Sequence, residues 1–186
     1  MVTGSDTRLG DWLDAVAHRS ATPSGGAVAA VTLAAAAALG AMVARFSVGV
    51  IGDADSLASQ ADAVRRHALE LAAADEAVVS ALYPGAAGGA GTGKGRAAQE
   101  AVRRAAEVPL EIVEAAAALT PVLRRLRGEG NQRLAGDAQV ALELLEASAR
   151  AAAALVRIDV HSLGAPERAT VLSSLSSAEA ALRAAR

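Results

Sequence analysis

The chain has 186 residues, which is enough for one domain with a substantial core and short for two. Its 18 basic and 20 acidic residues give a net charge of −2, without the basic stripe that would bind nucleic-acid phosphates. It has no cysteine, which excludes disulfides and thiolate metal sites, and its three histidines lack the spacing of zinc ligands. We therefore expect a single domain over residues 1–186, with no metal site and no nucleic-acid partner.

The composition predicts an all-α fold. Hydrophobic residues make up 53% of the chain but aromatic residues only 2%, so the apolar content is mostly alanine, leucine and valine. Alanine is the strongest helix former, whereas sheets favour β-branched and aromatic side chains.

Residues 23–44 contain no charged side chain, which raises the question of a membrane span. Most of this stretch is alanine and glycine, which contribute little to membrane insertion, and an all-apolar helix of small residues also suits the centre of a bundle. Residues 1–10 include an acidic side chain and lack the apolar run of a secretory signal. We expect a buried central helix, no membrane association and a cytoplasmic location.

Periodicity and breakers predict six helices in chain order. They cover residues 7–18, 27–48, 55–83, 96–127, about 134 or 137 to 160, and 164 to the C-terminus. Pro109 and Pro121 fall inside the fourth, where we expect kinks or breaks. The result is a bundle of five to six helices around an alanine-rich central helix. Alanine buries little area, and apolar burial contributes about 25 cal/mol per Å², so we also expect a homodimer that buries more surface.

The glycine-rich segment 85–95 partly matches a phosphate-binding loop. Gly88 is followed at the P-loop spacing by Gly93 and Lys94, but Gly95 stands where serine or threonine would bind magnesium. A helix rather than a strand precedes the segment, so we interpret it as a linker.

Residues 22–30, TPSGGAVAA, lead directly into the uncharged helix. Gly25 and Gly26 allow close backbone approach, and a helix N-terminus offers free N–H groups to an anionic or carbonyl-bearing ligand. The alternative is an ordinary helix start.

Further short motifs follow the first in a fixed order. They are Gly40-Ala41-Met42-Val43-Ala44 with Ser47-Val48-Gly49, Asp75-Glu76-Ala77-Val78, Pro109-Leu110, and Gly130-Asn131 with Gly136-Asp137-Ala138. Together with residues 22–30 they resemble the signatures of the formiminotetrahydrofolate cyclodeaminase / methenyltetrahydrofolate cyclohydrolase family. In that family the first motif reads Pro-x-Pro/Ser-Gly-Gly-Gly-Ser-Val-Ala-Ala. The resemblance covers about residues 8–163.

The resemblance implies a helical homodimer with a folate pocket near the subunit interface. It implies chemistry on the one-carbon bridge between N5 and N10 of tetrahydrofolate, the folate being the substrate. The cyclodeaminase closes 5-formimino-tetrahydrofolate to 5,10-methenyl-tetrahydrofolate and releases ammonia, and the cyclohydrolase opens the methenyl bridge with water towards 10-formyl-tetrahydrofolate. Both reactions pass through a tetrahedral carbon and need proton transfer rather than a metal or redox cofactor, which a carboxylate can supply.

On this resemblance Asp137 is the first candidate for a general acid/base and Asp75 the second. The groups expected to hold the folate are Ser24, Gly25, Gly26, Arg45 and Asn131. Each candidate has an alternative role from the residues alone. Asp137 would be an N-cap, Asp75 a solvent-facing acid, Asn131 a turn residue and Arg45 a solvated helix-end cation.

The chain departs from the family pattern at several motif positions. Ala27 follows the glycine pair, Arg45 replaces an asparagine, Val78 an aromatic residue and Gly136 a serine. The rival hypothesis is therefore a catalytically inactive helical protein that serves as a binding or assembly partner. Asp75 and Asp137 buried at one cleft would favour the enzyme, whereas carboxylates in bulk solvent would favour the rival.

Overall fold

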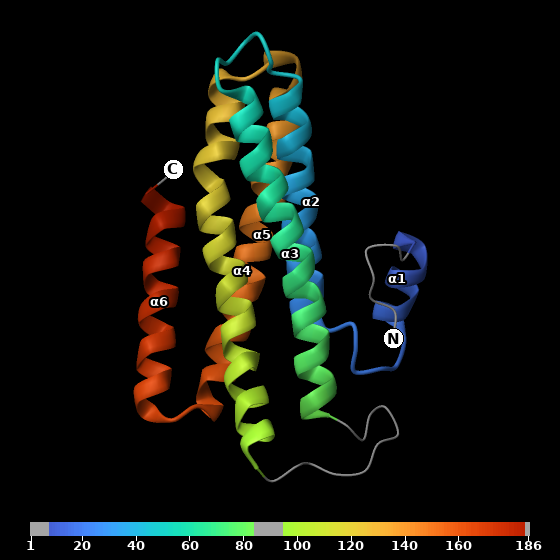
Figure 1. Ribbon diagram of the computed structural model, residues 1–186, viewed down its shortest axis with the longest axis vertical. Coiled ribbons are helices and arrows are strands. Elements are labelled where there is room, and N and C mark those ends of the chain that lie inside the picture. The colour runs from blue at the N-terminus through green and yellow to red at the C-terminus, as the bar shows by residue number, and fades with distance from the viewer. Residues whose placement is uncertain (1–7, 84–94, 185–186) are drawn as a thin grey trace.

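The computed structural model describes residues 8–83 and 95–184 (Figure 1). Its α-helices are α1 (Leu9–Ala17), α2 (Gly25–Arg45), α3 (Ala54–Leu82), α4 (Arg96–Glu129), α5 (Ala135–Asp159) and α6 (Ala165–Ala184). Two short 3₁₀ helices, Gln132–Leu134 and Val160–Ser162, flank α5. The described residues contain no strand beyond one isolated bridge between Val48 and Ile51, so the predicted all-α fold is confirmed.

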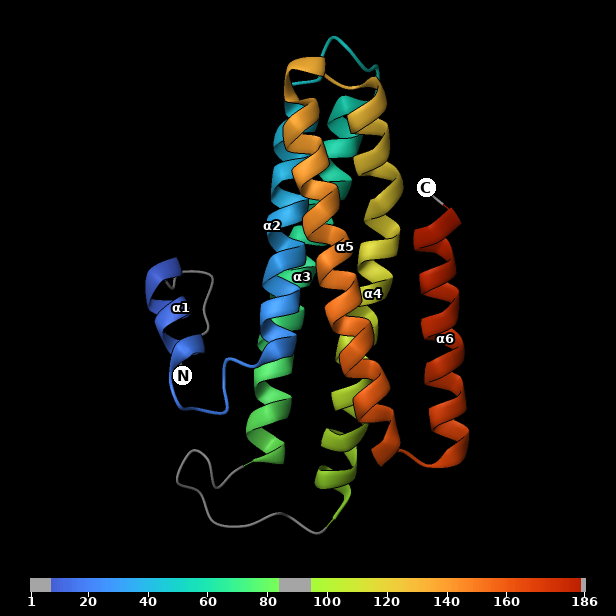
Figure 2. The same ribbon diagram turned by 180° about the vertical axis from the view of Figure 1, so that it is seen from behind.

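Helices α2 to α5 run alternately up and down along the long axis and form the body of the molecule (Figures 1 and 2). Helix α6 packs mainly against α4, whereas α1 lies on the opposite side of the bundle. Because α2 and α4 run in one direction and α3 and α5 in the other, the N-terminus of α2 lies near the C-terminal half of α3. This topology decides which of the candidate residues can meet.

Helix α2 packs against α3, α5 and α4, as the sequence predicts for a central helix. Its small residues allow close approach: a Cβ at Gly40 would lie 2.3 Å from the Leu123 Cδ2 atom of α4. Among the described helices, α2 is the one long and apolar enough to cross a membrane, with a mean hydropathy of 2.2. In this fold 61% of that apolar stretch is buried inside the molecule.

Three sequence predictions need correction or fall outside the described structure. Helix α4 continues through Pro109 and Pro121, so neither proline breaks it. Each proline removes one backbone hydrogen bond, but Pro109 is itself buried within the packed part of the helix, where tertiary contacts support it. Helix α5 begins at Ala135, so Asp137 is not its N-cap and lies in its first turn. The P-loop-like residues 88–94 lie outside the described residues.

Candidate functional site at the N-terminus of α2

The N-terminus of α2 is capped by a side chain from another helix. Ser24 occupies the N-cap position, but its hydroxyl donates a 2.5 Å hydrogen bond to Oδ2 of Asp75 on α3 rather than accepting one from α2. The same Oδ2 atom accepts a 2.9 Å hydrogen bond from the backbone N–H of Ala27. Asp75 therefore satisfies a free N–H group of α2, at the helix end where the dipole favours a negative charge.

Gly26 makes this contact sterically feasible. A Cβ at position 26 would lie 2.0 Å from Oδ1 and 2.5 Å from Cγ of Asp75. Gly25, by contrast, has no atom within 4 Å of the corresponding position. The two glycines of the motif therefore differ in role, and Gly26 is the one that admits the carboxylate.

Asp75 is 8% exposed, so it is a buried acid and the alternative of a solvent-facing one is wrong. Desolvation raises the pKa of Asp75, and the hydrogen bonds from Ser24 and Ala27 oppose this rise by stabilising the carboxylate. Both of these hydrogen bonds end on Oδ2, and no described residue donates to Oδ1. Two donors thus fix Oδ2, whereas Oδ1 lies against Gly26 and accepts no hydrogen bond from a described residue.

A second carboxyl group, which the sequence analysis missed, lies near the first. Asp159 is half-buried at the end of α5, and its pKa is raised by desolvation and by the negative charge of Asp75. The sequence held no signal for it, because no recognisable motif surrounds Asp159, and its proximity to Asp75 depends on the packing of both α3 and α5 against α2.

An apolar groove of about 450 Å³ adjoins Ser24 and runs between α2 and α5. The volume is within the usual range for small-molecule sites. Its lining includes Val16 of α1, and Pro23 follows Thr22 through a cis peptide bond. The remaining lining residues are Ser24, Gly25, Val28, Ala29, Thr32, Ala147, Ser148 and Ala151. Such a lining suits a flat, mostly apolar ligand with a polar group at the Ser24 end.

Two other candidates, Arg45 and Asn131, lie at the opposite end of the bundle. The exposed Arg45 forms an ion pair with Asp62. Asn131 joins the turn after α2 to the turn after α4: its backbone N–H donates to Ser47 Oγ at 3.0 Å, and its Nδ2 donates to the Phe46 carbonyl at 3.1 Å. Its Oδ1 accepts from the Arg133 N–H at 3.1 Å. Asn131 thus has the local structural role that its position in a turn suggested.

Within one chain, Asp137 does not share a cleft with Asp75. The Ser148 hydroxyl of α5 donates to the Ala29 carbonyl of α2, which fixes the register of these antiparallel helices. From that point Asp137 lies eleven residues towards one end and Gly26 three residues towards the other. At 1.5 Å per residue, Asp137 and the Asp75 site are roughly 20 Å apart along the bundle. Asp137 is half-buried in the first turn of α5, where the helix dipole favours its charge.

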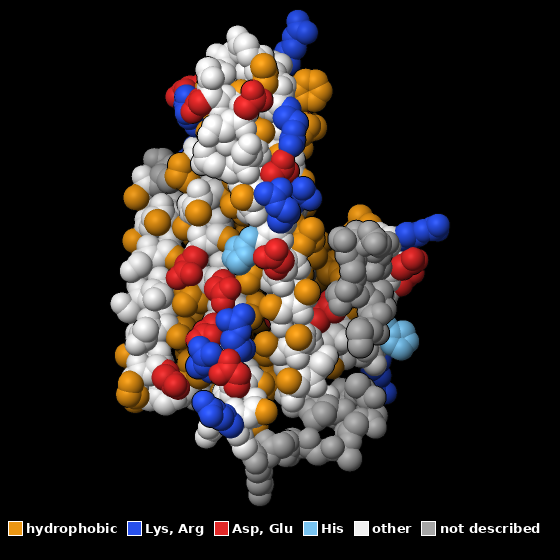
Figure 3. Space-filling view, in the orientation of Figure 1, with side chains coloured by type: hydrophobic (Ala, Val, Ile, Leu, Met, Phe, Trp, Pro, Cys, Tyr) orange, Lys and Arg blue, Asp and Glu red, His pale blue; other side chains and the backbone are white. Residues whose placement is uncertain are grey.

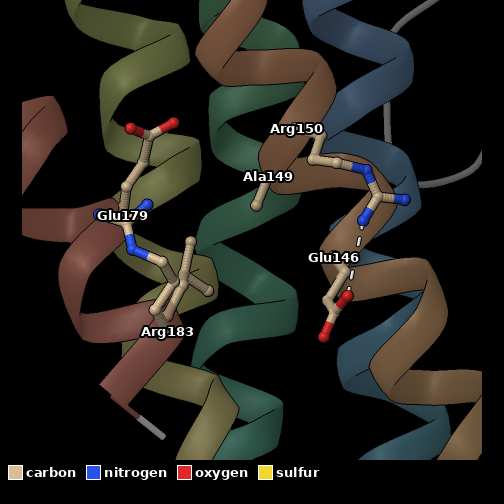
Figure 4. A pocket seen from close by; sticks show the side chains of 6 residues that line it. Glu146, Ala149, Arg150, Glu179 and Arg183 are labelled. Carbon is tan, nitrogen blue, oxygen red and sulfur yellow. Dashed lines mark hydrogen bonds and ion pairs between the residues drawn. The ribbon is translucent and has the colours of Figure 1, made fainter. Parts of the chain in front are cut away.

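Figure 4 shows another hollow, between α5 and α6, of about 120 Å³. Three of its charged groups already have partners, because Arg150 contacts Glu146 at 3.5 Å and Glu179 pairs with Arg157 at 2.7 Å. The hollow is small and offers no buried acid, so we place the candidate site at the N-terminus of α2.

The family described as formiminotransferase-cyclodeaminase matches residues 8–177. Formimidoyltransferase-cyclodeaminase from Mus musculus is 34% identical over 152 residues, and the match covers 76% of this chain and 28% of the mouse protein. The chain thus spans less than a third of that relative's length.

The fold has a solved counterpart. A crystal structure of formiminotetrahydrofolate cyclodeaminase from Thermotoga maritima superposes with a TM-score of 0.87 and 26% identity, covering 97% of this chain and 92% of that one. The match in sequence over residues 8–177 and the match in structure lead to one conclusion: the chain belongs to the formiminotransferase-cyclodeaminase family.

Proposed function

We propose that this protein is a one-carbon folate enzyme that acts on the bridge between N5 and N10 of tetrahydrofolate, with Asp75 as the proton-transfer group. The observation that carries the proposal is the buried Asp75 carboxyl, fixed through Oδ2 by Ala27 and by Ser24, which also lines the apolar groove. The similarity to proteins named as cyclodeaminases supplies the substrate class.

The geometry suits both reactions of the bridging carbon. In the cyclodeaminase direction, N10 attacks the formimino carbon, its proton passes to Asp75, and Asp75 returns a proton to the departing nitrogen, which leaves as ammonia. In the cyclohydrolase direction, water attacks the methenyl carbon, Asp75 accepts its proton, and a proton is delivered to N5 as the C–N5 bond breaks. A raised pKa brings the carboxyl closer to neutral pH, where it exchanges protons more effectively.

The two directions are distinguished by presenting each substrate separately. A cyclodeaminase releases ammonia from 5-formimino-tetrahydrofolate and produces the near-ultraviolet absorbance of the methenyl compound. A cyclohydrolase removes that absorbance faster than buffer does. If neither change exceeds the buffer control, the enzymatic proposal is contradicted, and the rival hypothesis of an inactive helical binding protein is favoured.

We further propose that the active unit is a homodimer formed through the face of α2 and α5. Figure 2 shows these helices side by side on that face. The outward stripe of α5 is apolar at spacings of three and four residues: Val140, Leu144, Ala147, Ala151, Ala154 and Ile158. Val140 is 51% exposed and Ile158 67% exposed, and α2 has no charged residue before Arg45. The opposite face, in Figure 3, carries many acidic and basic side chains over α3 and α4. A second copy is the occupant that this uncharged face fits, because a two-fold contact buries the same patch on both subunits.

A two-fold axis across this face and perpendicular to the helices would also reunite the divided site. It would place the α2 N-terminus of one subunit over the opposite end of its partner. Asp137 of the partner subunit would then approach Ser24 and Asp75. The proposal explains why the candidate residues of a single subunit lie at opposite ends of the helical bundle.

Mixing inactive variants tests the composite site. Asp75→Asn and Asp137→Asn should each abolish turnover as homodimers. If each site combines Asp75 of one subunit with Asp137 of the other, mixed dimers contain one intact site. An equimolar mixture that exchanges subunits randomly should then recover about a quarter of wild-type activity. A full activity of Asp137→Asn alone would remove Asp137 from the site, and a lack of recovery despite proven subunit exchange would contradict the composite arrangement.

A further inference from the structure

Asp159 is a carboxyl group in a position that ordinary helix energetics disfavours. It is the last residue of α5, where the helix dipole opposes a negative charge, and it is half-buried. No described residue forms a hydrogen bond or ion pair with it, whereas nearby Arg157 pairs with Glu179 of α6. A contribution to the stability of the fold therefore does not explain why an acid occupies this position.

The register of α5 places Asp159 on the side of the candidate site. It follows Ser148 by eleven residues, which is three helical turns, so both side chains project from the same face of α5. Ser148 faces α2 through its hydrogen bond to Ala29, and α2 begins only four residues before Ala29. Asp159 consequently lies past the N-terminus of α2, at the end of the bundle that holds Ser24 and Asp75, and the charge of Asp75 acts on it.

The surroundings of these two acids hold no described cation that pairs with either. The contacts of Asp75 are the Ser24 hydroxyl and the Ala27 N–H, and the charge that acts on Asp159 is that of Asp75. The next residue of α3, Glu76, is 9% exposed, and its buried Oε1 accepts no hydrogen bond. Neither Asp75 nor Asp159 is therefore neutralised by an ion pair with a described residue.

We propose that Asp159 is a specificity-determining residue of the site, which together with Asp75 selects folates whose one-carbon unit carries a positive charge. The inference rests on the proposed function and deepens it. The methenyl bridge is an amidinium cation shared by two nitrogens, and a protonated formimino group is an amidinium as well. The 10-formyl group is a neutral amide. Two carboxyls attract the cationic methenyl and formimino groups but not the neutral 10-formyl group. Binding of the substrate is therefore favoured over binding of the hydrolysis product.

The test compares a cationic with a neutral folate in Asp159→Asn. The KM for 5,10-methenyl-tetrahydrofolate should rise roughly five- to twentyfold, because one attractive charge is removed. The inhibition constant of 10-formyl-tetrahydrofolate should change less than about twofold, since that ligand has no charge at the one-carbon unit. Glu143→Gln, which removes one charge from the exposed surface of the same helix, is the matched control and should change neither value. Asp159→Glu should restore most of the preference.

The outcomes separate this inference from the proposed function. Equal changes for the two folates, or none, in an active protein would overturn the role of Asp159 and leave the reaction standing. If the wild type binds folates without turnover, dissociation constants of the same two ligands from calorimetry decide the question in the same way. A wild type that binds neither folate would overturn both proposals.

Discussion

Among substitutions that add one methyl group at the candidate site, Gly26→Ala should be the most damaging. The new Cβ would lie 2.0 Å from Oδ1 of Asp75, so the carboxylate must move away. It would then lose the hydrogen bonds from Ser24 and Ala27. Hydrogen bonds to a charged group contribute about 1.5–3 kcal/mol each.

Part of that loss is recovered. A displaced Asp75 regains some hydration, and alanine is favoured over glycine in a helix by about 1 kcal/mol. The expected net destabilisation is about 2–4 kcal/mol, or a fall in Tm of roughly 4–16 °C for a chain of this size. The activity should be lost even below the unfolding transition, because the acid no longer occupies the position fixed by Ser24 and Ala27.

Gly25→Ala is the matched control for stability, because nothing lies within 4 Å of its Cβ position. Thermal unfolding followed by circular dichroism at 222 nm, with turnover at a temperature where all three proteins are folded, checks both effects. Equal Tm values and equal activities for the two alanine variants would refute the reasoning that Gly26 admits Asp75.

Three further predictions follow from the same geometry. Asp75→Asn retains an acceptor for Ser24 and Ala27 but removes the acid, so it should abolish turnover. Burial raises the folded-state pKa of Asp75, so ionising it above that pKa costs stability. The variant should therefore have a Tm at least equal to that of the wild type at pH 8. The difference in Tm between the variant and the wild type should shrink as the pH falls towards 4, because the wild-type carboxyl becomes protonated. A difference that grows in favour of the variant at low pH would contradict the raised pKa. Ala151→Glu, on the exposed apolar stripe of α5, should shift the protein from dimer to monomer in analytical ultracentrifugation, whereas Ala181→Glu on the exposed side of α6 should not; a wild-type monomer at micromolar concentration would contradict the dimer. Gly40→Ala forces a Cβ within 2.3 Å of Leu123 Cδ2. It should lower the free energy of unfolding in urea by about 1–3 kcal/mol. An unchanged urea midpoint would contradict this prediction.

The helices could be predicted from the sequence because their signals are local. Alanine-rich runs, apolar periodicity and glycine or proline breaks predicted the bounds of the described helices to within about three residues. The continuity of α4 through Pro109 and Pro121 could not be predicted in this way. Its supporting contacts come from neighbouring helices, and tertiary packing overrode the local preference.

The candidate site was predictable in part. Ser24, Gly26 and Asp75 were each identified, but the contact between them spans about fifty residues and becomes visible only when α3 packs on α2. Asp159 carried no local pattern at all. The separation of Ser24 from Arg45 was foreseeable, because the predicted helix between them is about 30 Å long at 1.5 Å per residue.

The most direct measurement of the central claim is the rate at which the protein removes the near-ultraviolet absorbance of 5,10-methenyl-tetrahydrofolate, compared between the wild type and Asp75→Asn. The account predicts a wild-type rate above the buffer control, reduced by about 10² to 10⁴-fold in the variant, which should remain folded. A variant that matches an active wild type would contradict the assignment of Asp75 as the proton-transfer group.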